Sequence, residues 1–70
     1  MITIRVFRNS GQTPVSGKEV SLHDSVGYRR AKTDASGSVN FDVKSGRYTV
    51  HIDGRIYHDG PIVGVLMLYV

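Results

Sequence analysis

The chain has 70 residues, no cysteine and a formal net charge of +3. We expect a single domain spanning residues 1–70 that buries only about 60% of its unfolded surface. The lack of cysteine excludes disulfides and thiolate zinc sites, so association with a second chain is the first candidate for additional stability. The small positive excess is well below that of typical nucleic-acid-binding domains.

The two ends of the chain suggest no targeting or membrane segment. Residues 1–5 already alternate as a strand does, so we expect no signal peptide; with the lack of cysteine, this favours a cytoplasmic location. The longest apolar run, residues 61–70, is too short for a membrane helix. We therefore expect no contact with a membrane.

The first expected strand covers residues 1–8, where Ile2, Ile4 and Val6 alternate with polar positions. A period of two places these three side chains on one buried face. Phe7 falls on the opposite face, so it either lies against another chain or ends the strand. Residues 9–17 form a predicted loop around Pro14, and we expect Val15 to anchor that loop.

Two further strands follow the loop. Residues 18–23 alternate again, with Val20 and Leu22 inward, and residues 24–27 form a turn. Residues 28–33 form a polar, basic strand, which we place at a sheet edge because positive charge deters pairing with another edge.

Residues 32–54 are the most regular part of the chain. Val39, Phe41 and Val43 form one alternating run, and Tyr48, Val50 and Ile52 form the next. We predict that the two runs are paired antiparallel strands, with Phe41 and Tyr48 as core anchors. In the turn before the first run, Gly37 is predicted to adopt a positive φ and Asp34 to bind its own backbone.

The last third of the chain predicts a dimer. Asp53-Gly54 is a hairpin signal, residues 55–58 form a short strand, and residues 59–61 form a turn. Residues 62–70 are then a single strand whose two faces are both apolar. Because a sandwich strand needs only one apolar face, we expect a second chain to cover the other face in a two-fold dimer. The predicted interface consists of Val63, Val65, Met67 and Tyr69.

Together these elements predict an all-β fold, a small antiparallel Greek-key β-sandwich of about seven short strands. The sequence also resembles the carboxypeptidase regulatory-like domain, a transthyretin-like (prealbumin-like) β-sandwich. The matching residues are Gly11–Gly17, Val20–Leu22, Lys32–Gly37, Val39, Phe41 and Gly46–Val50. The resemblance implies a stabilising or adhesive module with no fixed ligand. The hydroxyisourate hydrolases share that fold but end in Tyr-Arg-Gly-Ser, whereas this chain ends Leu68-Tyr69-Val70, so their activity is not carried over.

Residues with catalytic or metal-binding side chains show no motif. His23, His51 and His58 have none of the short spacings of a metal site, so we expect no metal or other cofactor. Three of the aspartates, Asp34, Asp53 and Asp59, are explained by turns, and Asp42 lies on a solvated strand face. No pair of carboxylates or serine nucleophile has a catalytic context, so we expect no enzyme and no catalytic residue.

One further stretch could bind a ligand. Tyr28, Arg29, Arg30 and Lys32 combine an aromatic ring with positive charge, which could hold a nucleic acid strand, although we consider this less favoured than a charged edge strand. Tyr28, Tyr57 and Tyr69 could instead form a sugar-stacking surface. The main hypothesis is a non-catalytic structural or protein-interaction module; carbohydrate binding is the alternative and nucleic-acid binding a weaker one.

Overall fold

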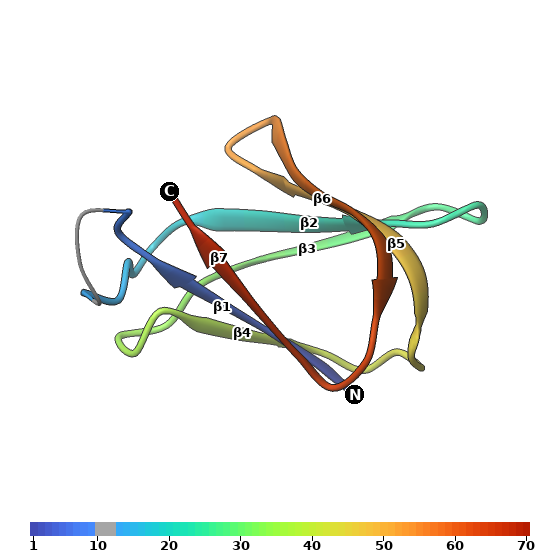
Figure 1. The fold of residues 1–70 in the computed structure, drawn as a ribbon, viewed down its shortest axis with the longest axis horizontal. Helices are drawn as coiled ribbons and strands as arrows, with labels where there is room; N and C mark the ends of the chain where they lie inside the picture. Colours follow the sequence, from blue (N-terminus) through green and yellow to red (C-terminus); the bar gives the residue numbers. More distant parts are fainter. Residues whose placement is uncertain (10–12) are drawn as a thin grey trace.

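The computed structural model describes residues 1–9 and 13–70, which fold into seven strands in two sheets (Figure 1). This confirms the all-β sandwich and the number of strands. The strands are β1 (Ile2–Phe7), β2 (Glu19–His23), β3 (Tyr28–Lys32), β4 (Ser38–Phe41), β5 (Gly46–Ile52), β6 (Arg55–Ile62) and β7 (Val65–Tyr69). Within the described residues, no helix is long and apolar enough to cross a membrane.

The two sheets differ in how their strands pair. One has the order β4-β1-β7 and the other the order β3-β2-β5-β6. All neighbours are antiparallel except β1 and β7, which run parallel, side by side in Figure 1. The wholly antiparallel sandwich predicted from the sequence is therefore wrong at this one pair. A parallel pair needs a long connection between its strands, and here five other strands lie between β1 and β7 in the chain.

The core lies between the sheets and is built from the alternating positions. Ile2, Ile4 and Val6 are fully buried, as predicted for the first strand. Val15, in the loop that precedes β2, is buried, and its carbonyl oxygen accepts a 2.7 Å hydrogen bond from the Thr33 hydroxyl. The core consists of Ile2, Ile4, Val6, Val15, Val20, Leu22, Val39, Phe41, Val50, Ile52, Ile62 and Leu68.

Two predictions about residues 32–54 are wrong. The runs that begin at Val39 and Tyr48 are not paired: β4 lies in the three-stranded sheet and β5 in the four-stranded one. A sequence pattern identifies the buried face of a strand but not the strand beside it, so the predicted pairing of these two strands is wrong. Phe41 is a buried core residue as predicted, whereas Tyr48 is only half-buried at the core margin and donates its hydroxyl to the Lys44 carbonyl oxygen.

The turns of this region are largely as predicted. Gly37 has a φ of 76° and a main-chain bond to the Asp34 carbonyl closes its turn. Asp53 and Gly54 both have positive φ, which is the geometry of a tight two-residue hairpin between β5 and β6. Residues 10–12 of the predicted loop lie outside the described residues.

The C-terminal third is divided differently from the prediction. β6 continues through Asp59, Gly60 and Pro61 to Ile62, where a turn was expected. Pro61 is tolerated there because β6 is an edge strand, which does not need every N–H for pairing. The predicted strand over residues 62–70 is two pieces: Val63 and Gly64, with a φ of 71°, separate β6 from β7.

Candidate functional site

The outer edge of β7 is the strongest candidate for a functional surface. In the part of the chain that the structure describes, β1 pairs with one side of β7 and no strand pairs with the other. Val65, Met67 and Tyr69 point away from the core and are 57%, 49% and 49% exposed, while Leu68 is buried. The predicted alternation of β7 is therefore confirmed. Val63 is also exposed but precedes β7.

Neighbouring side chains of β1 extend this exposed surface. The parallel register places Arg5 beside Met67 and Phe7 beside Tyr69. The Phe7 and Tyr69 rings stack with centroids 5.8 Å apart, and the Arg5 guanidinium carbon lies 5.2 Å from the Phe7 ring centroid. Tyr69 and Arg5 thus cover Phe7, which explains why an aromatic ring on the outward face of β1 is buried.

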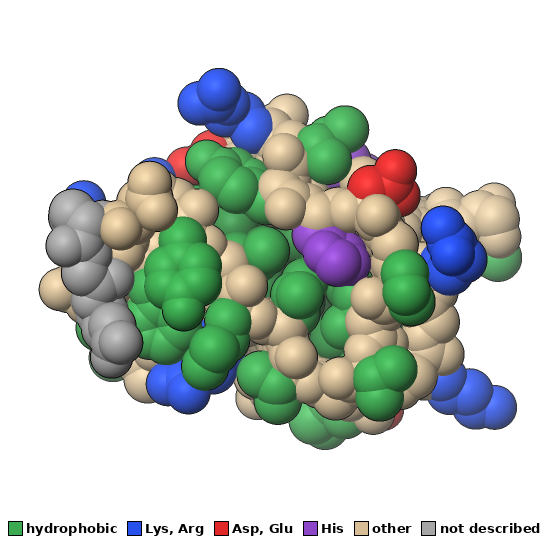
Figure 2. All heavy atoms as spheres, viewed as in Figure 1, with side chains coloured by type: hydrophobic (Ala, Val, Ile, Leu, Met, Phe, Trp, Pro, Cys, Tyr) green, Lys and Arg blue, Asp and Glu red, His purple; other side chains and the backbone are tan. Residues whose placement is uncertain are grey.

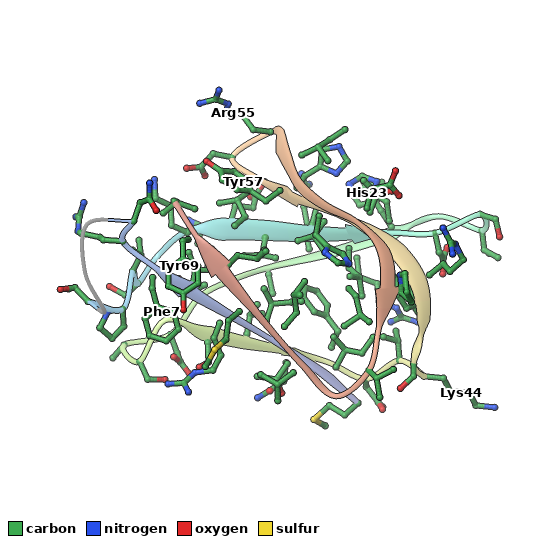
Figure 3. The ribbon with its side chains drawn as sticks, viewed as in Figure 1. Phe7, His23, Lys44, Arg55, Tyr57 and Tyr69 are labelled. Carbon is green, nitrogen blue, oxygen red and sulfur yellow. The ribbon has the colours of Figure 1, made fainter. Side chains whose placement is uncertain are left out.

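We call Phe7, Val65, Met67 and Tyr69 the β7 face. Hydrophobic side chains gather over β1 and β7 in Figure 2, and Figure 3 shows the Phe7 and Tyr69 rings side by side. Arg5, Phe7, Met67 and Tyr69 line a shallow hollow of about 360 Å³. A shallow hollow lined by aromatic rings, a methionine and a guanidinium can accept a side chain from a second molecule.

The backbone N–H and C=O groups of β7 alternate between the two sides of the strand. The Gly64 carbonyl accepts a hydrogen bond from Thr3, the Val70 N–H donates to the Phe7 carbonyl, and the Val70 carbonyl accepts from Asn9. The N–H and C=O of one residue point to the same side of a strand, and successive residues alternate. Even-numbered residues therefore face β1, and Val65, Met67 and Tyr69 direct their N–H and C=O groups to the open edge.

The other three sheet edges carry features that discourage pairing. β3 bears Arg29, Arg30 and Lys32, and β4 has only four residues. β6 contains Asp59 and Pro61, and a register shift opposite Val50 and His51 breaks its ladder. Charge, proline, short length and bulges are the usual protections of edge strands. Among the edge strands of the described residues, β7 combines five uncharged residues with a continuous register and no proline.

The residues of the predicted ligand surface lie apart from one another. Tyr28, Arg29, Arg30 and Lys32 belong to β3, at one edge of the four-stranded sheet, and are exposed. Tyr57 is half-buried against the core in β6, at the opposite edge of that sheet, and Tyr69 belongs to the other sheet (Figure 3). The three tyrosines therefore form no common stacking surface.

The basic residues of β3 have acidic neighbours. The Arg30 guanidinium lies 3.9 Å from the Glu19 carboxylate, and its carbon lies 5.9 Å from the Tyr28 ring centroid. Lys18, on the approach to β2, forms a 2.8 Å ion pair with Asp53. Carboxylates thus lie beside Arg30 and Lys18 and interrupt the positive charge, which is not the unbroken basic stripe that follows a nucleic acid backbone.

The structure brings two of the three histidines together. The rings of His23 and His51, on neighbouring strands β2 and β5, have centroids 4.3 Å apart, and His23 also stacks on Tyr28 at 5.3 Å. His51 Nδ1 is buried and has no hydrogen-bond partner. His58 instead lies near the Pro61 carbonyl oxygen, at 3.3 Å. Among residues 1–9 and 13–70, no three side chains of metal-ligating type form a cluster.

The sequence contains a signal for the contact between His23 and His51. His23 and His51 both occupy outward positions of alternating runs, but only the register of β2 on β5 shows that they are diagonal neighbours. Beside them lies a polar hollow of about 350 Å³, lined by His23, Asp24, Ser25, Arg47, Tyr48, Thr49 and Asp59.

The carboxylates next to turns have structural roles. Two backbone N–H groups, of Val26 and Gly27, donate to Asp24 and lower the pKa of its carboxyl group. The Ser36 hydroxyl and the Ser38 N–H, the two largest causes, lower the pKa of Asp34, and the bond from Lys18 lowers that of Asp53. A lowered pKa keeps these groups ionised as acceptors, whereas a general acid needs a raised one.

Comparisons with protein families, characterised proteins and solved structures found no match to this chain. The resemblance to transthyretin-like domains therefore stays a prediction from the residues, and the geometry of the sheets is the basis for any proposal about function.

Proposed function

We propose that this protein is a non-catalytic interaction module that associates with a second copy of itself through β7. The observation that carries the proposal is the contrast between the described edges: β3 and β6 carry charge or proline, β4 is shorter, and the β7 edge is open and uncharged. An unprotected edge of this kind is a hazard for a monomer unless a partner occupies it. The β7 face supplies apolar area, and the backbone supplies hydrogen bonds.

A second copy is the occupant that best fits the chemistry of β7. The strand consists of Val65, Leu66, Met67, Leu68 and Tyr69, all uncharged. Two identical β7 strands can therefore meet with no buried like charges. A chain of 70 residues also has a small core, so area buried between subunits contributes a large share of its stability.

The other two hypotheses have less geometric support. Carbohydrate recognition through Tyr28, Tyr57 and Tyr69 would need rings that converge, and they lie at two edges of one sheet and in the other sheet. Nucleic-acid binding through Arg29, Arg30 and Lys32 would need a continuous positive surface, and Glu19 lies beside Arg30. β7 instead combines three exposed apolar side chains with unpaired backbone groups on an uncharged strand.

Light scattering tests the proposal directly. The unmodified chain at high micromolar concentration should have twice its monomer mass of 7.7 kDa. Val65→Lys places a charge on the open edge strand, where lysine deters edge-to-edge pairing, and should convert the dimer to monomer. Val26→Lys is the matched control, because Val26 is 93% exposed at the tip between β2 and β3 and should leave the dimer intact. A monomeric mass for the unmodified chain would refute the proposal.

A further inference from the structure

We infer that two copies join edge to edge, with β7 antiparallel to β7 of the partner and Met67 on the two-fold axis, to form one continuous sheet. This inference rests on the proposed self-association and specifies its geometry. The strand order across the dimer is then β4-β1-β7 followed by the same three strands of the partner in reverse. The alternative geometry packs the two β7 faces as layers and leaves both β7 edges open.

The backbone polarity of β7 selects this register. Val65, Met67 and Tyr69 direct their N–H and C=O groups to the open edge, as the bonds of Gly64 and Val70 to β1 require. In an antiparallel ladder, two opposite residues with this orientation exchange both hydrogen bonds. A two-fold axis at Met67 places Met67 opposite its own copy and Val65 opposite Tyr69 of the partner subunit. Every outward-directed backbone group of the strand is then paired.

Side-chain chemistry agrees with the same register. Residues opposite each other in a sheet point to the same face, so Met67 meets Met67 of the partner subunit on the outer face and Val65 meets the partner's Tyr69. An aromatic ring opposite a β-branched side chain is a favourable cross-strand pair. On the inner face, half-buried Leu66 lies opposite the partner's Leu68 and extends the core across the interface.

The nearest charges do not oppose this arrangement. Arg5 is in register with Met67 on the adjacent strand β1. Across the dimer, Arg5 and its copy are separated by three strand spacings, about 14 Å. That separation exceeds the Debye length of about 8 Å at physiological ionic strength, so repulsion between them is largely screened. Edge-to-edge pairing therefore costs little in electrostatic energy.

Hydrogen exchange on the unmodified protein tests the register without substitution. In a monomer, the amides of Val65, Met67 and Tyr69 face water and exchange rapidly, while the amides that face β1 are protected. In the inferred dimer all amides of β7 are protected, so we expect the three odd-numbered amides to slow by about tenfold or more as concentration rises through the dissociation constant. Layered packing would leave those three amides fast and would overturn the inference.

Cysteine cross-linking tests the position of the axis, because the chain has no cysteine of its own. Met67→Cys places two thiols on residues about 5.5 Å apart at their Cα atoms, within the range for a disulfide. Val65→Cys is the matched control, since its two copies lie four residues apart along the strands, about 14 Å. We expect Met67→Cys to form a covalent dimer under mild oxidation and Val65→Cys alone to form little, whereas a mixture of Val65→Cys and Tyr69→Cys chains cross-links.

The outcomes separate the two claims. A dimer that dissociates with Val65→Lys but shows equal cross-linking at positions 65 and 67 overturns the inferred register and leaves the proposed function standing. A chain that stays monomeric refutes both. Should Met67→Cys fail to fold, as its circular dichroism would show, the exchange pattern of the unmodified chain decides the question.

Discussion

At the scale of single residues, Gly37 is the described glycine with the least space for a side chain. Its φ of 76° disfavours any side chain, and a Cβ atom there would lie 2.7 Å from the Val6 carbonyl oxygen and 2.9 Å from the Pro14 Cβ. The same glycine donates and accepts main-chain hydrogen bonds, to the Asp34 carbonyl and from the Val6 N–H. It therefore joins the turn before β4 to both β1 and the loop at Pro14.

Gly37→Ala should consequently destabilise the fold strongly. The matched control is Gly17→Ala: Gly17 has a φ of 73°, but a Cβ atom there would meet nothing within 4 Å. The control should cost about 1–2 kcal/mol through backbone conformation alone. Gly37→Ala should cost about 1–3 kcal/mol more, because the neighbouring backbone must move. Urea unfolding of both variants measures the difference, and equal losses would contradict the close packing of this turn.

The turn residue Asp34 gives a prediction about pH. Its carboxylate accepts bonds from the Ser36 N–H, the Ser36 hydroxyl and the Ser38 N–H, which lower its pKa below the ordinary value of 3.8. A pKa that is lower in the folded state means stability that is fully present above the unfolded value and is lost as pH falls through the folded one. Acidification below about pH 4 should thus weaken the fold.

Asp34→Asn should remove part of this acid sensitivity. The variant is expected to be less stable than the parent at pH 7 and to lose less stability between pH 5 and pH 2, because the position no longer titrates. Asp42→Asn is the control, since Asp42 is exposed and makes no side-chain hydrogen bond to any described residue. Thermal melts across this pH range provide the measurement. Identical pH profiles for parent and Asp34→Asn would show that the turn contributes nothing.

At the scale of elements, local sequence patterns predict where strands lie but not which strands pair with each other. The buried faces of β1, β2 and β4 follow from alternation, because a period of two leaves only one apolar side. Neither the placement of β4 and β5 in different sheets nor the parallel pairing of β7 with β1 is encoded locally. Which strands are neighbours depends on contacts between segments far apart in sequence, and one sequence alone does not reveal these.

Residues 62–70 show the same limit for boundaries. A continuous apolar run is compatible with one long strand or with two shorter ones. A single strand over residues 62–70 would contain Gly64, although glycine inside a strand often marks a bend. The division moves Ile62 into the four-stranded sheet and leaves β7 as an edge. Val65, Met67 and Tyr69 nevertheless point away from the core, as the alternating pattern predicts. The bend at Gly64 precedes β7 and does not disturb the alternation within it.

At the scale of the whole molecule, self-association would make stability depend on concentration. When only the dimer pairs the β7 edge, each tenfold increase in protein concentration raises the free energy of dimer unfolding by about 1.4 kcal/mol. For two chains of 70 residues this corresponds to an increase in Tm on the order of 3–6 °C. Calorimetry of the unmodified chain over a hundredfold range of concentration should show this trend. Val65→Lys should have a lower Tm that does not vary with concentration, whereas Val26→Lys should keep the trend of the parent. A Tm that is constant for all three proteins would mean that β7 remains exposed and that the fold is stable with an open edge.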